Sequence, residues 1–155
     1  MDFSLHIVHL WNMLRRMTRS APTAKSPPVD VRSPDTAAKV LPVFFRIADA
    51  WALSVAEQQV LLGVGKSTLA VWRSGKVKAG LDATVLERLS YLFGIYGALQ
   101  ILLPIPERAD AWMRRPNSAP LFGGASALKR MLGGHVADLF AVHAYLNAQR
   151  GGDFA

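Results

Sequence analysis

Apolar positions along the chain recur at spacings of three and four residues, which is the period of an amphipathic helix. No segment shows the two-residue alternation that is typical of a half-buried strand. The clearest helical patterns cover residues 37–53, 82–102 and 135–149. In the last of these, the pattern predicts a buried stripe of Val136, Leu139, Phe140, His143 and Leu146. The sequence therefore predicts an all-α fold of about seven helices in two modules.

Prolines and capping residues set the expected helix ends. Pro42 suits the first turn of a helix that begins at Ala37 or Leu41, because an N–H is not needed there. Asp82 is the expected cap of a long helix that ends at Leu102. Shorter helices are expected over 54–62, 66–74, 107–115 and 126–132.

The first 36 residues differ from the rest of the chain. Residues 20–36 are rich in Pro, Ser and Ala and lack periodicity, which indicates a linker. Residues 3–14 have an amphipathic pattern and predict a leader helix, with a poorly ordered leader or an interfacial membrane helix as alternatives. Arg15 and Arg16 follow the apolar residues, whereas a secretory signal has its positive charges first.

Two interpretations compete for segment 63–68, Gly-Val-Gly-Lys-Ser-Thr. A phosphate loop needs a further Gly five residues before the second one and a strand in front of it, so that backbone N–H groups surround the phosphates. Here Val60 occupies the position of that Gly, and residues 54–62 begin with a Ser-x-x-Glu capping box and have helical character. The pattern favours a helix-turn-helix over an NTP-hydrolysing enzyme.

In a helix-turn-helix, the first helix would end at Gly63 in the left-handed conformation, and the second would run from Lys66 to Ser74. Leu69 and Trp72 share the face that should pack on the core. The opposite face and the loop after it contain no acidic residue as far as Lys78, so DNA contact is favoured over a merely solvated surface. The predicted DNA-binding residues are Lys66, Ser67, Thr68, Val71, Arg73, Lys76 and Lys78.

Composition narrows the possible functions. A formal net charge of +7 suggests a polyanion or an acidic protein as partner. The absence of Cys excludes disulfides and thiolate chemistry, and it fits a reducing cytoplasm. The four His show no metal-ligand spacing with a carboxylate pair, so we expect no metal, no cofactor and no catalytic residue. No apolar stretch approaches the roughly 20 residues that span a bilayer.

The C-terminal third has the most specific pattern. It contains Trp-Met-Arg-Arg-Pro-Asn at 112–117, then Leu-Phe-Gly-Gly-Ala-Ser-Ala-Leu-Lys-Arg-Met-Leu-Gly-Gly at 121–134, and finally the segment 145–155. This order resembles the toxin-binding domain of the Xre/MbcA/ParS antitoxins, especially those paired with RES-domain toxins. The resemblance covers about residues 41–155. One departure is Gln59, which stands where the family usually packs a small residue.

The resemblance implies a cytoplasmic, homodimeric antitoxin that binds and blocks a RES-domain toxin and represses its own operon by binding operator DNA. RES toxins deplete NAD, so NAD would be a substrate of the toxin and no cofactor of this chain. The expected parts are a leader and linker at 1–36, a helix-turn-helix domain at 37–103 and a toxin-binding domain at 104–155. A plain transcriptional regulator whose C-terminal helices only dimerise it is the alternative.

The residues of the C-terminal tail suit such an inhibitor. Glycines would release the chain from the last helix, and a terminal aromatic residue with a free carboxylate could enter a cleft, although a frayed terminus is the simpler interpretation. The predicted toxin-binding residues are Tyr145, Gln149, Arg150, Gly151, Gly152, Asp153, Phe154 and Ala155.

Overall fold

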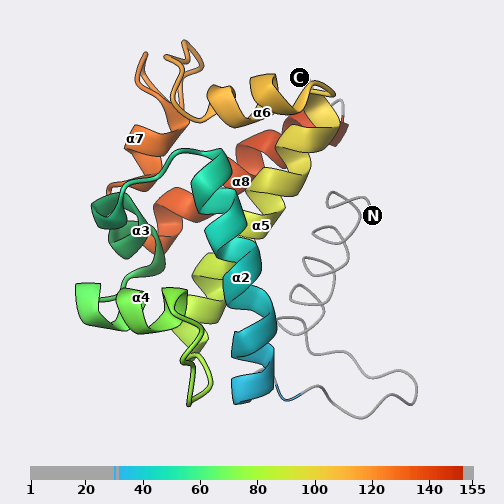
Figure 1. Ribbon diagram of the computed structural model, residues 1–155. Coiled ribbons are helices and arrows are strands. Elements are labelled where there is room, and N and C mark those ends of the chain that lie inside the picture. The colour runs from blue at the N-terminus through green and yellow to red at the C-terminus, as the bar shows by residue number, and fades with distance from the viewer. Residues whose placement is uncertain (1–29, 31, 152–155) are drawn as a thin grey trace.

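The computed structural model describes Asp30 and residues 32–151, and this part of the chain is built from seven α-helices without a strand. The helices are α2 (Pro34–Ala50), α3 (Val55–Leu62), α4 (Lys66–Arg73), α5 (Ala83–Leu102), α6 (Pro106–Trp112), α7 (Ala127–Met131) and α8 (Val136–Gly151) (Figure 1). The all-α prediction is therefore confirmed. The expected leader helix at 3–14 lies outside the described residues.

Helix α2 begins earlier than the sequence pattern predicted. The side chain of Ser33 accepts a hydrogen bond from the Thr36 N–H at 3.2 Å, and Pro34 occupies the first turn. The placement of Pro42 in the first turn was wrong, because it lies inside the helix at an exposed position. Either proline was compatible with a first turn, and the cap at Ser33 decides between them. Residues 34–36, predicted as linker, are therefore helical.

The helix-turn-helix forms as its local signals predicted. The Ser54 N–H donates to Glu57 Oε2 at 2.7 Å and the Glu57 N–H donates to Ser54 Oγ at 3.2 Å, which completes a capping box at the start of α3. Gly63 ends α3 with a φ of 69°. Because α3 precedes this turn, the strand that a phosphate loop requires is not there.

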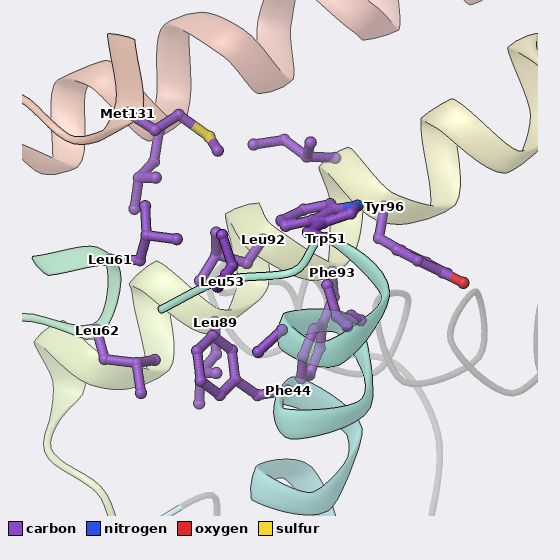
Figure 2. Close-up of a cluster of buried hydrophobic side chains, with 14 of the residues drawn as sticks. Phe44, Trp51, Leu53, Leu61, Leu62, Leu89, Leu92, Phe93, Tyr96 and Met131 are labelled. Carbon is purple, nitrogen blue, oxygen red and sulfur yellow. The ribbon is translucent and has the colours of Figure 1, made fainter. Parts of the chain in front are cut away.

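One hydrophobic core joins the helix-turn-helix to the C-terminal helices. Every residue of α5 from Leu92 to Leu99 is buried, as expected of a helix surrounded by others, and its most extensive contact is with α8. Figure 2 shows Met131 of α7 directed toward the cluster that contains Trp51, Leu53 and Leu61. The two halves therefore share their interior.

The predicted buried stripe of α8 was partly wrong. Leu139, Val142 and Leu146 are buried, whereas Phe140 is 54% exposed and its ring lies edge-on to that of Tyr91 at 5.9 Å. Helical spacing allows a stripe that Phe140 and His143 complete or one that Val142 completes, and only the burial in the folded chain distinguishes them, in favour of Val142. Val136 and His143 are half-buried.

Candidate functional site

Helix α4 presents its predicted polar face to solvent. Leu69 is 2% exposed and Trp72 is half-buried against the core, so this side of the helix is fixed. All the predicted DNA-binding residues are exposed, and Val71 is an apolar member with 47% exposure. The order of basic, hydroxyl and apolar groups provides donors for phosphates and an apolar contact for a base edge.

Arg73 differs from the other members of this set because it is bound within the chain. Its Nη2 lies 2.6 Å from Asp49 Oδ1, and its guanidinium lies 4.9 Å from the centre of the Phe45 ring. Its Nη1 also donates to Gln58 Oε1 at 3.4 Å. The side chain is 45% exposed, so it both reaches solvent and joins α4 to α2.

Gln58, and not Gln59, is the buried amide of α3. Gln58 is 4% exposed and its Nε2 donates to the Leu53 carbonyl at 2.8 Å. Gln59 is only half-buried. The helix-turn-helix thus forms with Gln59 at the position where the family pattern has a small residue.

The C-terminal motif residues form one tightly bonded loop between α6 and α7. The Asn117 N–H donates to the Ala125 carbonyl at 3.1 Å, and the Gly124 N–H donates back to the Asn117 carbonyl at 3.0 Å. Gly123 and Gly124 both have positive φ, 56° and 84°, a conformation that favours glycine. Residues 117–125 of the quoted motifs therefore close this loop.

The predicted toxin-binding residues lie at the end of α8. Tyr145 is half-buried and its ring is edge-on to Phe122 at 5.1 Å, which makes it partly a packing residue. Gln149 is half-buried, while Arg150 and Gly151 are exposed. Gly152, Asp153, Phe154 and Ala155 lie outside the described residues. In Figure 1 the end of α8 is at the upper right and α4 is at the lower left, so the two predicted surfaces are far apart.

Arg114, which follows α6, reaches across to the helix-turn-helix. It donates to both carboxylate oxygens of Glu57, at 3.2 and 2.9 Å, and to the carbonyls of Trp51 and Ala52, at 3.2 and 2.7 Å. The hydrogen bond from Arg114 lowers the pKa of Glu57, partly opposed by burial. Sequence reasoning missed this role, although the residue lies in the quoted motif at 112–117.

Arg88 of α5 makes a second connection and was also missed. It is 9% exposed; its Nη1 donates to the carbonyls of Val60 and Leu61 at 3.3 and 3.2 Å, and its Nη2 donates to the Gly134 carbonyl at 2.7 Å. Its positive charge lies at the C-terminus of α3, where helix carbonyls lack partners and the helix dipole is negative. A lone cation within a long apolar helix was the available signal.

Across Asp30 and residues 32–151, no three His, Cys, Asp or Glu side chains are grouped to hold a metal ion. Burial raises the pKa of Asp110, whose Oδ1 accepts a hydrogen bond from Gln100 Nε2 at 3.3 Å. None of the helices described is both long and apolar enough to cross a membrane.

The fold and its surfaces define a helix-turn-helix protein with a second, small helical domain. Residues 30–94 match the family described as the antitoxin Xre-like helix-turn-helix domain, and residues 98–152 match the antitoxin Xre/MbcA/ParS C-terminal toxin-binding domain. The chain is 52% identical over 113 residues to the uncharacterized protein y4oB of Sinorhizobium fredii (strain NBRC 101917 / NGR234). The matched residues make up 72% of this chain and 84% of that protein. The chain belongs to the Xre-type antitoxins.

The boundary between the two matched segments, residues 95–97, lies inside α5, and this helix passes from one segment to the other without interruption. A division of the chain after residue 103 remains a prediction. The toxin-binding domain implies that a toxin is a partner of this protein.

Proposed function

We propose that this antitoxin neutralises a RES-domain toxin by direct contact and represses its own operon by binding operator DNA as a cytoplasmic homodimer, without catalysing a reaction. The observation that carries the proposal is the presence, in one chain, of a toxin-binding domain and a helix-turn-helix whose second helix and following loop expose basic side chains. The RES class of the toxin rests on the motifs at 112–117 and 121–134 and on the segment 145–155.

The DNA-binding part of the proposal is supported by the positive charges on α4 and on the loop that follows it. Lys66, Lys76 and Lys78 are exposed, and none of them forms an ion pair with another described residue. Cations that are free in the protein can neutralise phosphates and release condensed counterions, which drives association with DNA. Ser67, Thr68 and Val71 are exposed on the same face, and we propose that they contact base edges.

The toxin-binding part is supported by the exposure of the last residues of α8. Arg150 and Gly151 are exposed at the end of α8, and four further residues follow them. Because the end of α8 is far from α4 in Figure 1, the two binding events need not compete for one surface. We propose that Tyr145, Gln149 and Arg150 form the base of the contact and that Gly151 to Ala155 enter the toxin.

Co-expression with the toxin gene that neighbours its own tests the proposal. The full chain should restore growth and co-purify with the toxin, whereas a chain ending at Arg150 should protect less while keeping its helical circular dichroism. A Lys129→Ala variant, altered at an exposed residue of α7, serves as the control and should protect fully. Failure of the full chain to rescue growth or to co-purify rejects the antitoxin–toxin pairing, and full protection by the shortened chain moves the contact away from the tail.

A second candidate, a plain transcriptional regulator, is supported by the shared core. The C-terminal helices complete the interior on which α2, α3 and α5 pack, so they would be needed for DNA binding even without a toxin. This candidate predicts binding to promoter DNA together with no rescue from any neighbouring toxin gene. The co-expression experiment therefore separates the two functions.

A further inference from the structure

Helix α3 is held at both of its ends by arginines that connect the two matched domains. At its start, Arg114 from the toxin-binding segment bonds to Glu57 and to the carbonyls of Trp51 and Ala52 just before the helix. At its end, Arg88 bonds to the carbonyls of Val60 and Leu61 and, on the other side, to the Gly134 carbonyl of the toxin-binding segment. Seven hydrogen bonds from the two arginines thus hold α3 in place or link the two matched segments.

The position of α3 determines that of α4. The two helices are joined by the short turn from Gly63 to Gly65, and Gln58 of α3 accepts a hydrogen bond from Arg73 of α4 at 3.4 Å. The buried Leu69 fixes the rotation of α4 about its axis. A shift of α3 would therefore carry the predicted DNA-binding surface with it.

No flexible linker separates this unit from the toxin-binding domain. Helix α5 runs unbroken from residue 83 to residue 102 through both matched segments, and the core is continuous across them. Many DNA-binding proteins attach the helix-turn-helix to a dimerisation domain, and the attachment sets the distance between the two recognition helices. In this chain, α5 and the two arginines attach the helix-turn-helix to the toxin-binding domain.

We infer that Arg114 and Arg88 are positioning residues for DNA recognition, which hold α3 and α4 at one place on the toxin-binding domain so that a dimer accepts one separation of operator half-sites. This inference rests on the proposed DNA-binding function and on the proposed homodimer. In this proposal, neither arginine contacts DNA itself. Their effect is on the tolerance for half-site spacing, which a contribution to overall stability would leave unchanged.

Two substitutions loosen the Arg114 contact with opposite changes of charge. Arg114→Gln removes a positive charge, whereas Glu57→Gln removes a negative one and leaves an amide oxygen that can still accept from the Ser54 N–H. Simple electrostatics predicts weaker DNA binding for the first variant and stronger binding for the second. The positioning role predicts the same loss of spacing selectivity for both.

The experiment measures binding of the full chain to DNA upstream of its own coding region. Footprinting locates the two half-sites, and duplexes with two base pairs inserted between them rotate one half-site by about 70° about the DNA axis. The parent protein should lose at least about tenfold in affinity on this insertion. Arg114→Gln and Glu57→Gln should each lose less than about threefold, relative to their own affinity for the natural spacing.

Arg115→Gln is the matched control, because it removes the same charge from the adjacent exposed residue. It should keep the parent's spacing dependence. Circular dichroism and co-purification with the toxin check that each variant is folded, and Glu57→Gln keeps the test valid should Arg114→Gln unfold. Equal spacing dependence in the parent, Arg114→Gln and Glu57→Gln overturns the inference. A parent that binds all spacings equally overturns it as well. A parent that binds no promoter DNA rejects the proposed DNA function, and the inference with it.

Discussion

At Gly63, two separate requirements for glycine meet in one residue. Its φ of 69° lies in the left-handed region, where a Cβ is disfavoured by about 1–2 kcal/mol. In addition, a Cβ at this position would lie 3.1 Å from Arg88 Nε. The turn of the helix-turn-helix and the arginine that caps α3 are therefore fitted to each other at this point.

Gly63→Ala and Gly75→Ala together separate these two requirements. Gly75 also has a positive φ, 75°, but an added Cβ there meets no atom within 4 Å. We expect Gly75→Ala to lower the free energy of unfolding by about 1 kcal/mol, and Gly63→Ala to lower it by about 1 kcal/mol more. Urea denaturation followed by circular dichroism measures both losses, and equal losses would show that Arg88 moves aside without a penalty.

The Glu57–Arg114 contact predicts a pH-dependent contribution to stability. Because the pKa of Glu57 is lowered in the folded state, the stabilisation is present above the unfolded pKa of about 4.3 and disappears as the pH falls through the folded value. Arg114 is 44% exposed, so we expect Glu57→Gln to lower the free energy of unfolding at pH 7 by only about 0.5–1 kcal/mol.

Denaturation of the parent and of Glu57→Gln at pH 7 and near pH 3 measures this effect. The difference between them should shrink at the lower pH, because the parent carboxyl is then also neutral. Glu107→Gln, at an exposed position of α6, is the control and should differ from the parent by less than about 0.5 kcal/mol at pH 7. A difference for Glu57→Gln that grows in acid contradicts the assigned direction of the pKa change.

At the scale of the element, the basic residues of α4 and of the loop after it include three lysines without an ion pair to another described residue and one arginine that is bound within the chain. Lys76→Ala and Lys78→Ala should each weaken DNA binding and lower the dependence of log affinity on log salt by about 0.9, the value for one phosphate contact. Arg73→Ala should change the salt dependence less, because Asp49 already pairs with the guanidinium. Titrations at several salt concentrations measure these slopes, with Lys129→Ala as the control for an equal loss of charge; unchanged slopes for both lysine variants remove them from the interface.

Elements with local signals were predictable from the sequence, and the contacts between elements were not. The side chains of Ser54, Asp82 and Ser126 each accept a hydrogen bond from an N–H three residues ahead, so the signal for each helix start lies within four consecutive residues. The buried face of α8 depends on its packing against α5 and α7, and helical spacing alone did not give this face, so Phe140 was misplaced.

The candidate site divides in the same way. The exposed face of α4 follows from helical periodicity once Leu69 is known to be buried. The hydrogen bonds from Arg114 to residues 51, 52 and 57 join residues more than fifty positions apart in the sequence, so no local sequence pattern could predict them. The contact of Arg73 with Asp49 likewise needs the packing of α4 on α2.

At the scale of the whole molecule, the continuous core predicts that the described part unfolds as one unit. Leu139 of α8 is fully buried, and α8 packs on α5, which in turn contacts α2 and α3. Loss of packing at Leu139 should therefore be felt in α3 and α4, although neither helix belongs to the toxin-binding segment. Two independent domains would confine the loss to the C-terminal helices.

Leu139→Ala and Phe140→Ala are adjacent substitutions that test this coupling. We expect Leu139→Ala to lower the free energy of unfolding by about 2–5 kcal/mol and to increase amide hydrogen exchange in the most protected residues of α3 and α8 by the same factor. Phe140→Ala, at a side chain that is 54% exposed, should cost less than about 1.5 kcal/mol. Faster exchange in α8 with unchanged exchange in α3 would mean that the two matched segments open separately. The hydrogen bonds of Arg88 and Arg114 would then be too weak to fix the position of α4.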